Sequence, residues 1–287
     1  MTARIVRTPE ALVGARLGSW GFVPTMGALH AGHLTLISRA AAENDVAAVS
    51  VFVNPAQFEN VSDLSRYPRD VPTDVARAEA AGARIIYAPE VSTMYPPGFS
   101  TWVEPGALAD GWEGKSRPGH FRGVATVVSI LLNAVRAERA YFGEKDIQQL
   151  RIIQHVHRDL RLPGQIIPSP TVRDVDGLAL SSRNARLSAE GRHTARKIPQ
   201  ALAAIVDAAQ VGVTEIETLE RIGRGVVDDP GLRLDYLAIV DDQTLVPEVS
   251  AGTRSRIVIA AEVDGVRLID NVALPWAADI QAVHGQQ

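Results

Sequence analysis

The chain has 287 residues, of which 46% are hydrophobic and 22% charged, with a net charge of −4. This is the composition of a globular protein with enough apolar material for one large domain or two smaller ones. The basic residues are scattered, which argues against a general nucleic-acid binder, and the lack of cysteine excludes disulfides, thiolate metal sites and a cysteine nucleophile. We also expect no membrane contact and a cytoplasmic location, because neither a signal peptide nor a stretch of ~18 apolar residues is visible.

Residues 1–171 alternate short β-branched runs with helical stretches, which predicts crossover units and a parallel sheet covered on both faces. We expect an α/β, Rossmann-like, doubly wound domain whose ligand site lies beyond the carboxyl ends of the strands, first of all after Pro24. The predicted strands are 21–24, 46–53, 83–88, 139–143 and 165–168. The predicted helices are 33–44, 71–81, 124–137 and 144–160.

Residues 172–287 follow another pattern and predict a smaller α+β domain. Ser188 is the expected N-cap of a helix that runs to Gln210, and Thr214 with Glu217 forms a capping box for the next helix. Alternating strands are predicted over 233–240, 256–263 and 266–272, and Asp264-Gly265 is a typical two-residue hairpin turn between the last two.

The segment PTMGALHAGH, from Pro24 to His33, follows the first predicted strand and opens the first predicted helix. Free N–H groups and the helix dipole favour phosphate at such a place. His30 and His33 share one face once the helix has begun, and Gly32 lets a nucleotide lie against the backbone. Two imidazoles beside a phosphate can stabilise phosphoryl transfer. Taken alone, two histidines that merely cap a helix explain the pattern equally well.

A second segment, FGEKD at 142–146, joins a predicted strand to a helix. Lys145 suits phosphate as a point charge, and Asp146 can accept a hydrogen bond from a ribose hydroxyl or assist a metal. Taken alone, the segment fits a solvated helix start better, since acidic side chains complement the helix dipole. Gln148 or Gln149, in the helix that follows, is a candidate for binding a polar substrate.

A third segment, DGLALSSRN at 176–184, lies where the two predicted domains meet. Ser181, Ser182 and Arg183 suit a triphosphate or its leaving pyrophosphate, although a surface loop explains the segment when it is taken alone. Two further loops at predicted strand ends or helix starts are weaker candidates. They are 54–57 (NPAQ) and 117–121 (RPGHF).

In this order and spacing, the segments resemble the pantothenate synthetase, or pantoate–β-alanine ligase, family. His-x-Gly-His alone indicates only the nucleotidylyltransferase superfamily, whereas FGEKD with two glutamines and the SSRN loop are far more specific. The resemblance covers nearly the whole chain. The matching stretches are PTMGALHAGH, FVNPAQF, YPR, RPGHFRGV, FGEKDIQQL, PTVRDVDGLALSSRN and RLIDNVAL.

The resemblance implies ATP-dependent condensation of (R)-pantoate with β-alanine to pantothenate, with Mg²⁺, through pantoyl adenylate and with release of AMP and pyrophosphate. It also implies a homodimer formed by the N-terminal domain and a C-terminal domain that acts as a lid. The residues suit this chemistry. His30, Lys145 and Arg183 can offset charge at the α-phosphate, a lid would keep water from the adenylate, and amine attack needs no enzyme nucleophile.

By family motif, His33 takes the proton-donor position, and His30, Lys145 and Arg183 complete the catalytic set. Gln57 and Gln149 bind pantoate, with Gln57 also meeting β-alanine. The neighbouring substrate-binding residues are Pro24, Thr25 and Asn54. The implied ATP-binding residues are Met26, Gly27, Ala28, Leu29, His30, Ala31, Gly32, His33, Gly143, Glu144, Lys145, Asp146, Val172, Leu180, Ser181, Ser182 and Arg183.

The chain departs from the family pattern at a few positions. The family usually has Glu at the position of Ala31, Tyr at that of Ile147 and Met at that of Leu180, and we expect these changes to tune the activity rather than remove it. The acidic cluster associated with magnesium is thinner here and consists of Thr73, Asp74 and Arg77. This weakens Asp74 as a candidate metal ligand.

Two other functions stay open at this point. A nucleotidylyltransferase that transfers AMP to a small acceptor has no amine step and would not require β-alanine. A nucleotide-binding regulatory module would bind ATP without releasing pyrophosphate. A tRNA synthetase is disfavoured, because neither an anticodon-binding domain nor a basic RNA-binding face is visible in the sequence.

Overall fold

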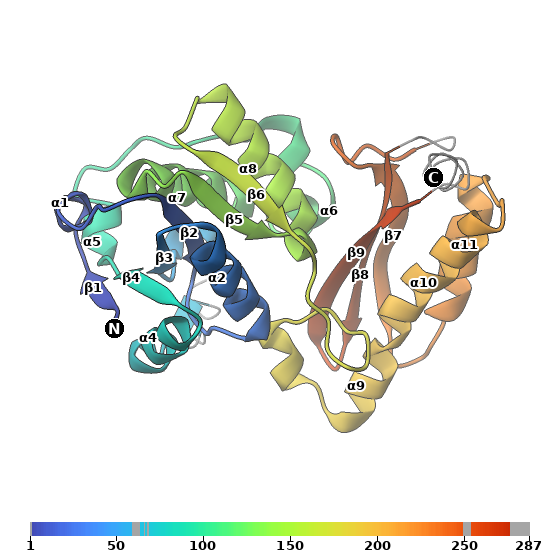
Figure 1. The fold of residues 1–287 in the computed structure, drawn as a ribbon. Coiled ribbons are helices and arrows are strands. Elements are labelled where there is room, and N and C mark those ends of the chain that lie inside the picture. The colour runs from blue at the N-terminus through green and yellow to red at the C-terminus, as the bar shows by residue number, and fades with distance from the viewer. Residues whose placement is uncertain (1, 59–63, 66, 68, 249–253, 276–287) are drawn as a thin grey trace, which may run out of the picture. The chain divides into compact units, whose positions relative to one another are not determined.

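The computed structural model describes residues 2–58, 64, 65, 67, 69–248 and 254–275. The chain divides into two compact units, Met1–Thr171 and Val172–Gln287, which Figure 1 shows in blue to green and in yellow to red. Pro68, in the YPR stretch, lies outside the described residues. Within the described part, no helix has the length and apolar character needed to cross a membrane.

The first unit is built on a six-stranded parallel sheet, which confirms the predicted α/β fold class. In spatial order the strands are β1 (Arg4–Val6), β4 (Ala83–Tyr87), β3 (Val46–Val51), β2 (Trp20–Thr25), β5 (Arg139–Gly143) and β6 (Gln165–Ser169). The strand order therefore reverses between β2 and β5, which is where such sheets bind ligands.

Helices cover both faces of this sheet (Figure 1). Ile37 and Ala40 of α2 (Ala31–Glu43) and Ala78 of α4 (Val71–Ala80) pack with Val23 and Val49 of the central strands. The opposite face carries α7 (His120–Val135) and α8 (Ile147–Asp159). The connecting segments contain α1 (Pro9–Val13), η1 (Pro55–Gln57), α5 (Val91–Met94), η2 (Gly106–Ala109), α6 (Trp112–Ser116) and η3 (Glu144–Asp146).

Several predicted bounds differ from the structure. The helix expected from Val124 begins at His120, after Gly119 in the left-handed region (φ 78°), so the RPGHF stretch forms its start. The helix expected over 144–160 begins with the separate turn η3 before α8. Strand β1 was not predicted, because three residues are too short a run to show a period of two.

The second unit combines α9 (Ala189–Ala195), α10 (Lys197–Gln210) and α11 (Ile216–Val226) with an antiparallel sheet of β7 (Arg233–Asp241), β8 (Ser255–Val263) and β9 (Val266–Leu274). It also contains the turn η4 (Ser182–Arg186). The predicted hairpin turn is confirmed, since Asp264 and Gly265 both have positive φ (55° and 70°).

Two helix predictions in this unit were wrong. The single helix expected from Ser188 to Gln210 is interrupted between Ala195 and Lys197, because Pro199 has no N–H to donate to the carbonyl four residues earlier. Ser188 does cap the first part, its hydroxyl accepting from Gly191 N at 2.9 Å. Thr214 is not an N-cap. Helix α11 starts after Glu215, whose carboxylate accepts a hydrogen bond from the Thr218 hydroxyl (3.1 Å).

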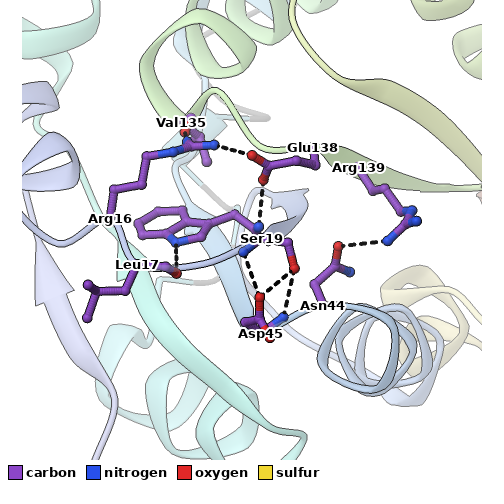
Figure 2. A network of polar contacts seen from close by, with 9 residues as sticks. Arg16, Leu17, Ser19, Asn44, Asp45, Val135, Glu138 and Arg139 are labelled. Carbon is purple, nitrogen blue, oxygen red and sulfur yellow. Dashed lines mark hydrogen bonds and ion pairs between the residues drawn. The ribbon is translucent and has the colours of Figure 1, made fainter.

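Polar contacts tie together the amino ends of the central strands, at the sheet edge away from the predicted ligand site (Figure 2). Glu138 accepts hydrogen bonds from Trp20 N and Arg16 Nη2, each at 2.6 Å. Asp45 Oδ2 accepts from the backbone N and hydroxyl of Ser19 at 2.8 and 2.9 Å. These contacts fix where β2, β3 and β5 begin, and hence where their carboxyl ends lie.

Candidate functional site

A buried carboxylate fixes the backbone conformation of the loop after β2. Gly27 (φ 83°) and Ala28 (φ 52°) adopt left-handed conformations that turn their backbone toward α4. There Asp74, only 3% exposed, accepts hydrogen bonds from Ala28 N (2.9 Å) and Leu29 N (2.8 Å). A Cβ at Gly27 would lie 2.6 Å from Asp74 Oδ2, so both the positive φ and the close approach require glycine.

Further hydrogen bonds fix both ends of this loop. The Thr25 hydroxyl donates to Ser50 O (2.6 Å) and accepts from Gly27 N (3.1 Å), which joins the ends of β2 and β3. Arg77 Nη1, one turn after Asp74 on α4, donates to Leu29 O at 2.6 Å. The loop is therefore a preformed backbone surface that ends at the first residue of the histidine pair.

His30 and His33 form a close pair of tilted rings at the start of α2. His30 is the N-cap residue, and the two ring centroids lie 4.0 Å apart with a 36° angle between the planes. Burial lowers the pKa of His33 to about 3, with a further contribution from His30. His33 Nδ1 accepts a hydrogen bond from His30 N (3.4 Å), so the proton of the neutral ring resides on Nε2.

Lys145 supplies the positive charge beside the pair. Its ammonium lies 3.3 Å from the Asp146 carboxylate. Burial, and next the charge of Lys145, lower the pKa of His30. Among the described residues, His30 Nδ1 is a buried ring nitrogen without a hydrogen-bond partner. Two neutral imidazoles and one ammonium thus meet where β2 and β5 end, as the sequence predicted for His30, His33 and Lys145.

The loop after β3 brings Asn54 and Gln57 to the same edge of the sheet. Gln57 is 7% exposed, and its Oε1 accepts a hydrogen bond from Asn54 Nδ2 at 3.0 Å. Asn54 Nδ2 also donates to Gly123 O (3.1 Å). A Cβ at Gly123 would lie 2.3 Å from Ala56 O, so glycine lets α7 approach this loop closely.

The two glutamines of α8 differ in what they contact. Gln148 Nε2 donates to Leu108 O and Gly111 O, and its Oε1 accepts from Glu113 N, each at 2.9 Å. Gln148 therefore holds the loop around α6. Gln149 is half-buried, and no hydrogen bond to another described residue involves its amide. Of the two, only Gln149 keeps an amide available for a ligand.

In the second unit, the segment that carries Ser181 and Arg183 is anchored at its base. Leu180 N donates to Val172 O (2.9 Å), and the Ser181 hydroxyl accepts from Arg183 N (3.2 Å). A second anchor is a paired contact of Arg173 with the buried carboxylate of Asp270 on β9, at 2.6 and 2.9 Å. This pair could not be predicted from the sequence, because Arg173 and Asp270 are 97 residues apart along the chain.

Asp74, a weak candidate metal ligand in the sequence, holds the loop after β2 in this structure. Each of its carboxylate oxygens accepts a backbone N–H of the loop, and the described residues contain no group of three or more His, Asp or Glu side chains arranged to hold a metal. The magnesium-associated position of the family motif is here a support for the loop. Both oxygens of Asp74 thus already accept hydrogen bonds, and a magnesium ion, which usually binds one or two carboxylates together with substrate phosphates, stays a proposal.

Comparisons with known proteins show which family the chain is similar to. The model of the pantoate-beta-alanine ligase family matches residues 4–273. The pantothenate synthetase of Rubrobacter xylanophilus is 50% identical over 264 residues, covering 89% of this chain and 91% of its own. That of Deinococcus radiodurans is 49% identical over 270 residues, covering 92% and 96%.

Solved structures show the same likeness. A crystal structure of pantothenate synthetase from Thermus thermophilus superposes with a TM-score of 0.90 at 45% identity, covering 95% of this chain and 99% of its own. Pantoate-beta-alanine ligase from Francisella tularensis, complexed with beta-gamma ATP and beta-alanine, gives 0.77 at 35% identity and covers 95% and 98%. The resemblance inferred from the sequence motifs is confirmed, and this chain belongs to the pantoate–β-alanine ligase family.

Proposed function

We propose that the chain joins (R)-pantoate to β-alanine at the expense of ATP, which is cleaved to AMP and pyrophosphate. The observation that carries this proposal is the neutral pair of His30 and His33 beside Lys145, at the point where the strand order reverses. Family membership and the ATP and β-alanine bound to the Francisella tularensis relative support the choice of substrates.

In the first step, a carboxylate oxygen of pantoate attacks the α-phosphorus of ATP. A phosphorus–oxygen bond forms, the bond to the bridging oxygen of the β-phosphate breaks, and pyrophosphate leaves with that electron pair. Negative charge builds on the oxygens around the α-phosphorus. The Nε2–H of His33, an imidazole hydrogen bond from His30 and the ammonium of Lys145 are placed to offset it.

In the second step, the amine of β-alanine attacks the acyl carbon of pantoyl adenylate. The new carbon–nitrogen bond replaces the carbon–oxygen bond, AMP leaves as the phosphate, and the amine gives up a proton. No enzyme nucleophile takes part. Gln57, in η1 after β3, and Gln149, in the first turn of α8, are the proposed pantoate-binding side chains, with Gln57 also near β-alanine.

The remaining roles rest on the family motif. The ATP-binding residues of the first unit are proposed at 26–33 and 143–146. Val172 and the 180–183 segment are proposed for ATP phosphates, with Arg183 as their cation. We assign no reaction step to Mg²⁺, and propose that the ion arrives with the phosphates of ATP, as is usual for nucleotide enzymes. The homodimer and the lid role of the second unit also stay proposals.

An exchange assay tests the proposal. Labelled pyrophosphate should enter ATP only when pantoate is present, with or without β-alanine, because adenylation is reversible. AMP and pantothenate should accumulate only when both substrates are supplied. Exchange that needs no acid would contradict the two-step scheme. Transfer of AMP to a final product without β-alanine would instead support the nucleotidylyltransferase alternative.

A further inference from the structure

A buried chain of hydrogen bonds leads from Tyr95 to Gln57. Tyr95, at the end of α5, donates from its hydroxyl to Asn54 Oδ1 at 2.7 Å. The same oxygen accepts from Ala56 N (3.2 Å). Asn54 is fully buried, and its Nδ2 donates to Gly123 O and to Gln57 Oε1. The Tyr95 hydroxyl, both polar atoms of the Asn54 amide and Gln57 Oε1 are thus paired, as buried polar groups usually are.

The backbone partners decide which way each amide points. Ala56 N can only donate, and Gly123 O can only accept, so Asn54 must present oxygen to the first and nitrogen to the second. Because Asn54 Nδ2 then faces Gln57, the Gln57 atom that meets it must be the oxygen. Both N–H groups of Gln57 Nε2 can therefore donate to a ligand, since no described residue accepts a hydrogen bond from them.

The ring and hydroxyl of Tyr95 are themselves fixed. The ring packs edge-on against Phe99, with centroids 5.0 Å apart, and lies nearly parallel to Trp102 at 6.2 Å. Burial raises the pKa of Tyr95, so its hydroxyl keeps the proton that it donates. Tyr95 is therefore a fixed donor at the end of the hydrogen-bond chain opposite Gln57.

The backbone of Gln57 is held from another side. The His120 ring accepts from Arg117 Nη1 through Nε2 (3.2 Å), since a guanidinium can only donate. Nδ1 of the same ring consequently carries the proton and donates to Gln57 O at 2.9 Å. Gln57 is fixed at both its main chain and its side-chain oxygen, which leaves little freedom to the amide nitrogen.

We propose that Tyr95 is a positioning residue that, through Asn54, makes Gln57 present a hydrogen-bond donor to the substrate. The ligand atom that hydrogen-bonds to Gln57 Nε2 is then an acceptor, such as a carboxylate or hydroxyl oxygen. This inference rests on the proposed pantoate site. It adds that Gln57 acts as a hydrogen-bond donor to pantoate and that Tyr95 determines this orientation.

The test is Tyr95→Phe, which removes the donating hydroxyl and keeps the ring. The Michaelis constant for pantoate should rise roughly three- to thirty-fold, the effect of weakening one buried hydrogen bond, while that for ATP stays within about twofold. Tyr87→Phe is the matched control. Tyr87 is fully buried, and its hydroxyl meets only the Met94 sulfur, at 4.0 Å, among the described residues.

Asn54→Asp provides a second test, because a carboxylate oxygen in place of Nδ2 would face Gln57 Oε1 and repel it. The pantoate constant should rise more than in Tyr95→Phe. Equal pantoate constants in Tyr95→Phe and Tyr87→Phe, with pantoate-dependent exchange intact in the wild type, overturn this inference alone. A wild type without pantoate-dependent exchange overturns both the inference and the proposed function. A parallel rise of the ATP and pantoate constants shows a general structural effect and also overturns the inference.

Discussion

Replacing Asp74 by asparagine tests whether its carboxylate fixes the conformation of the loop after β2, residues 26–30. In the wild type, one carboxylate oxygen serves Ala28 N and the other serves Leu29 N. Asparagine keeps one acceptor but places an NH2 group against the second backbone donor. One charge-assisted hydrogen bond is lost and a buried N–H is left without an acceptor, so the loop should lose the conformation that Gly27 and Ala28 adopt.

The magnitude follows from these two terms. A hydrogen bond to a charged group contributes about 1.5–3 kcal/mol, and a buried unsatisfied donor costs about 1–3 kcal/mol. Partial relaxation of the loop reduces their sum, and we expect Asp74→Asn to lower the free energy of unfolding by about 2–4 kcal/mol. For a domain of about 170 residues this corresponds to a melting temperature roughly 5–15 °C lower.

The assay combines melting with adenylate formation at several magnesium concentrations. We expect the Michaelis constant for ATP to rise about tenfold, as one to two kcal/mol of loop preorganisation is lost, while the magnesium dependence keeps its shape. Asp45→Asn is the matched control, since Asp45 also accepts a backbone N–H but lies at the opposite sheet edge (Figure 2). A selective shift in the magnesium requirement with unchanged melting would refute this account and restore the metal-ligand role.

The remaining predictions concern the histidine pair and the close approach of α7. His33→Ala should lower the rate of single-turnover adenylate formation at least ~100-fold. In the wild type, the pH profile of this rate should show no inflection from His33 between about pH 5 and 8, because the pKa of its ring is about 3. Wild-type stability to urea should fall as pH drops below 6.5, since the unfolded chain takes up a proton at His33 that the folded chain refuses, and His33→Ala should weaken this dependence. Gly123→Ala should cost about 1–3 kcal/mol in urea unfolding and raise the pantoate constant, because the added Cβ meets Ala56 O; unchanged unfolding would mean that α7 can shift away freely.

The sheet and its ligand edge could be predicted because their signals are local. Short apolar runs mark β2, β3 and β5, with Val in β3 and Tyr and Phe in β5, and the PTMGALHAGH and FGEKD segments lie at the ends of β2 and β5. Parallel strands bring their carboxyl ends to one edge, so segments more than 100 residues apart in sequence were expected to meet there. His30 and His33, with Lys145 near them, confirm that expectation.

What the sequence did not reveal are the contacts that hold this site in place. The two hydrogen bonds that Asp74 accepts from the loop after β2 could not be predicted, because a carboxylate carries no local sign of whether it will meet a cation or two N–H groups. Tyr95 lies in an unremarkable stretch before two prolines, and its hydroxyl finds Asn54 41 residues away. Gln148 and Gln149 are adjacent, and only the packing of Leu108 and Gly111 against the helix tells them apart.

The surroundings of His33, and not only its residue type, determine the role that it can take. The family motif gives it the proton-donor position, but burial beside a second imidazole keeps the ring neutral at physiological pH, with its proton on Nε2. A neutral imidazole holds that proton far more tightly than an imidazolium does. We therefore expect His33 to donate a hydrogen bond to the phosphate throughout adenylation and not to transfer a proton. Lys145 then supplies the positive charge at this edge of the sheet, and the two histidines supply hydrogen bonds that orient the phosphate.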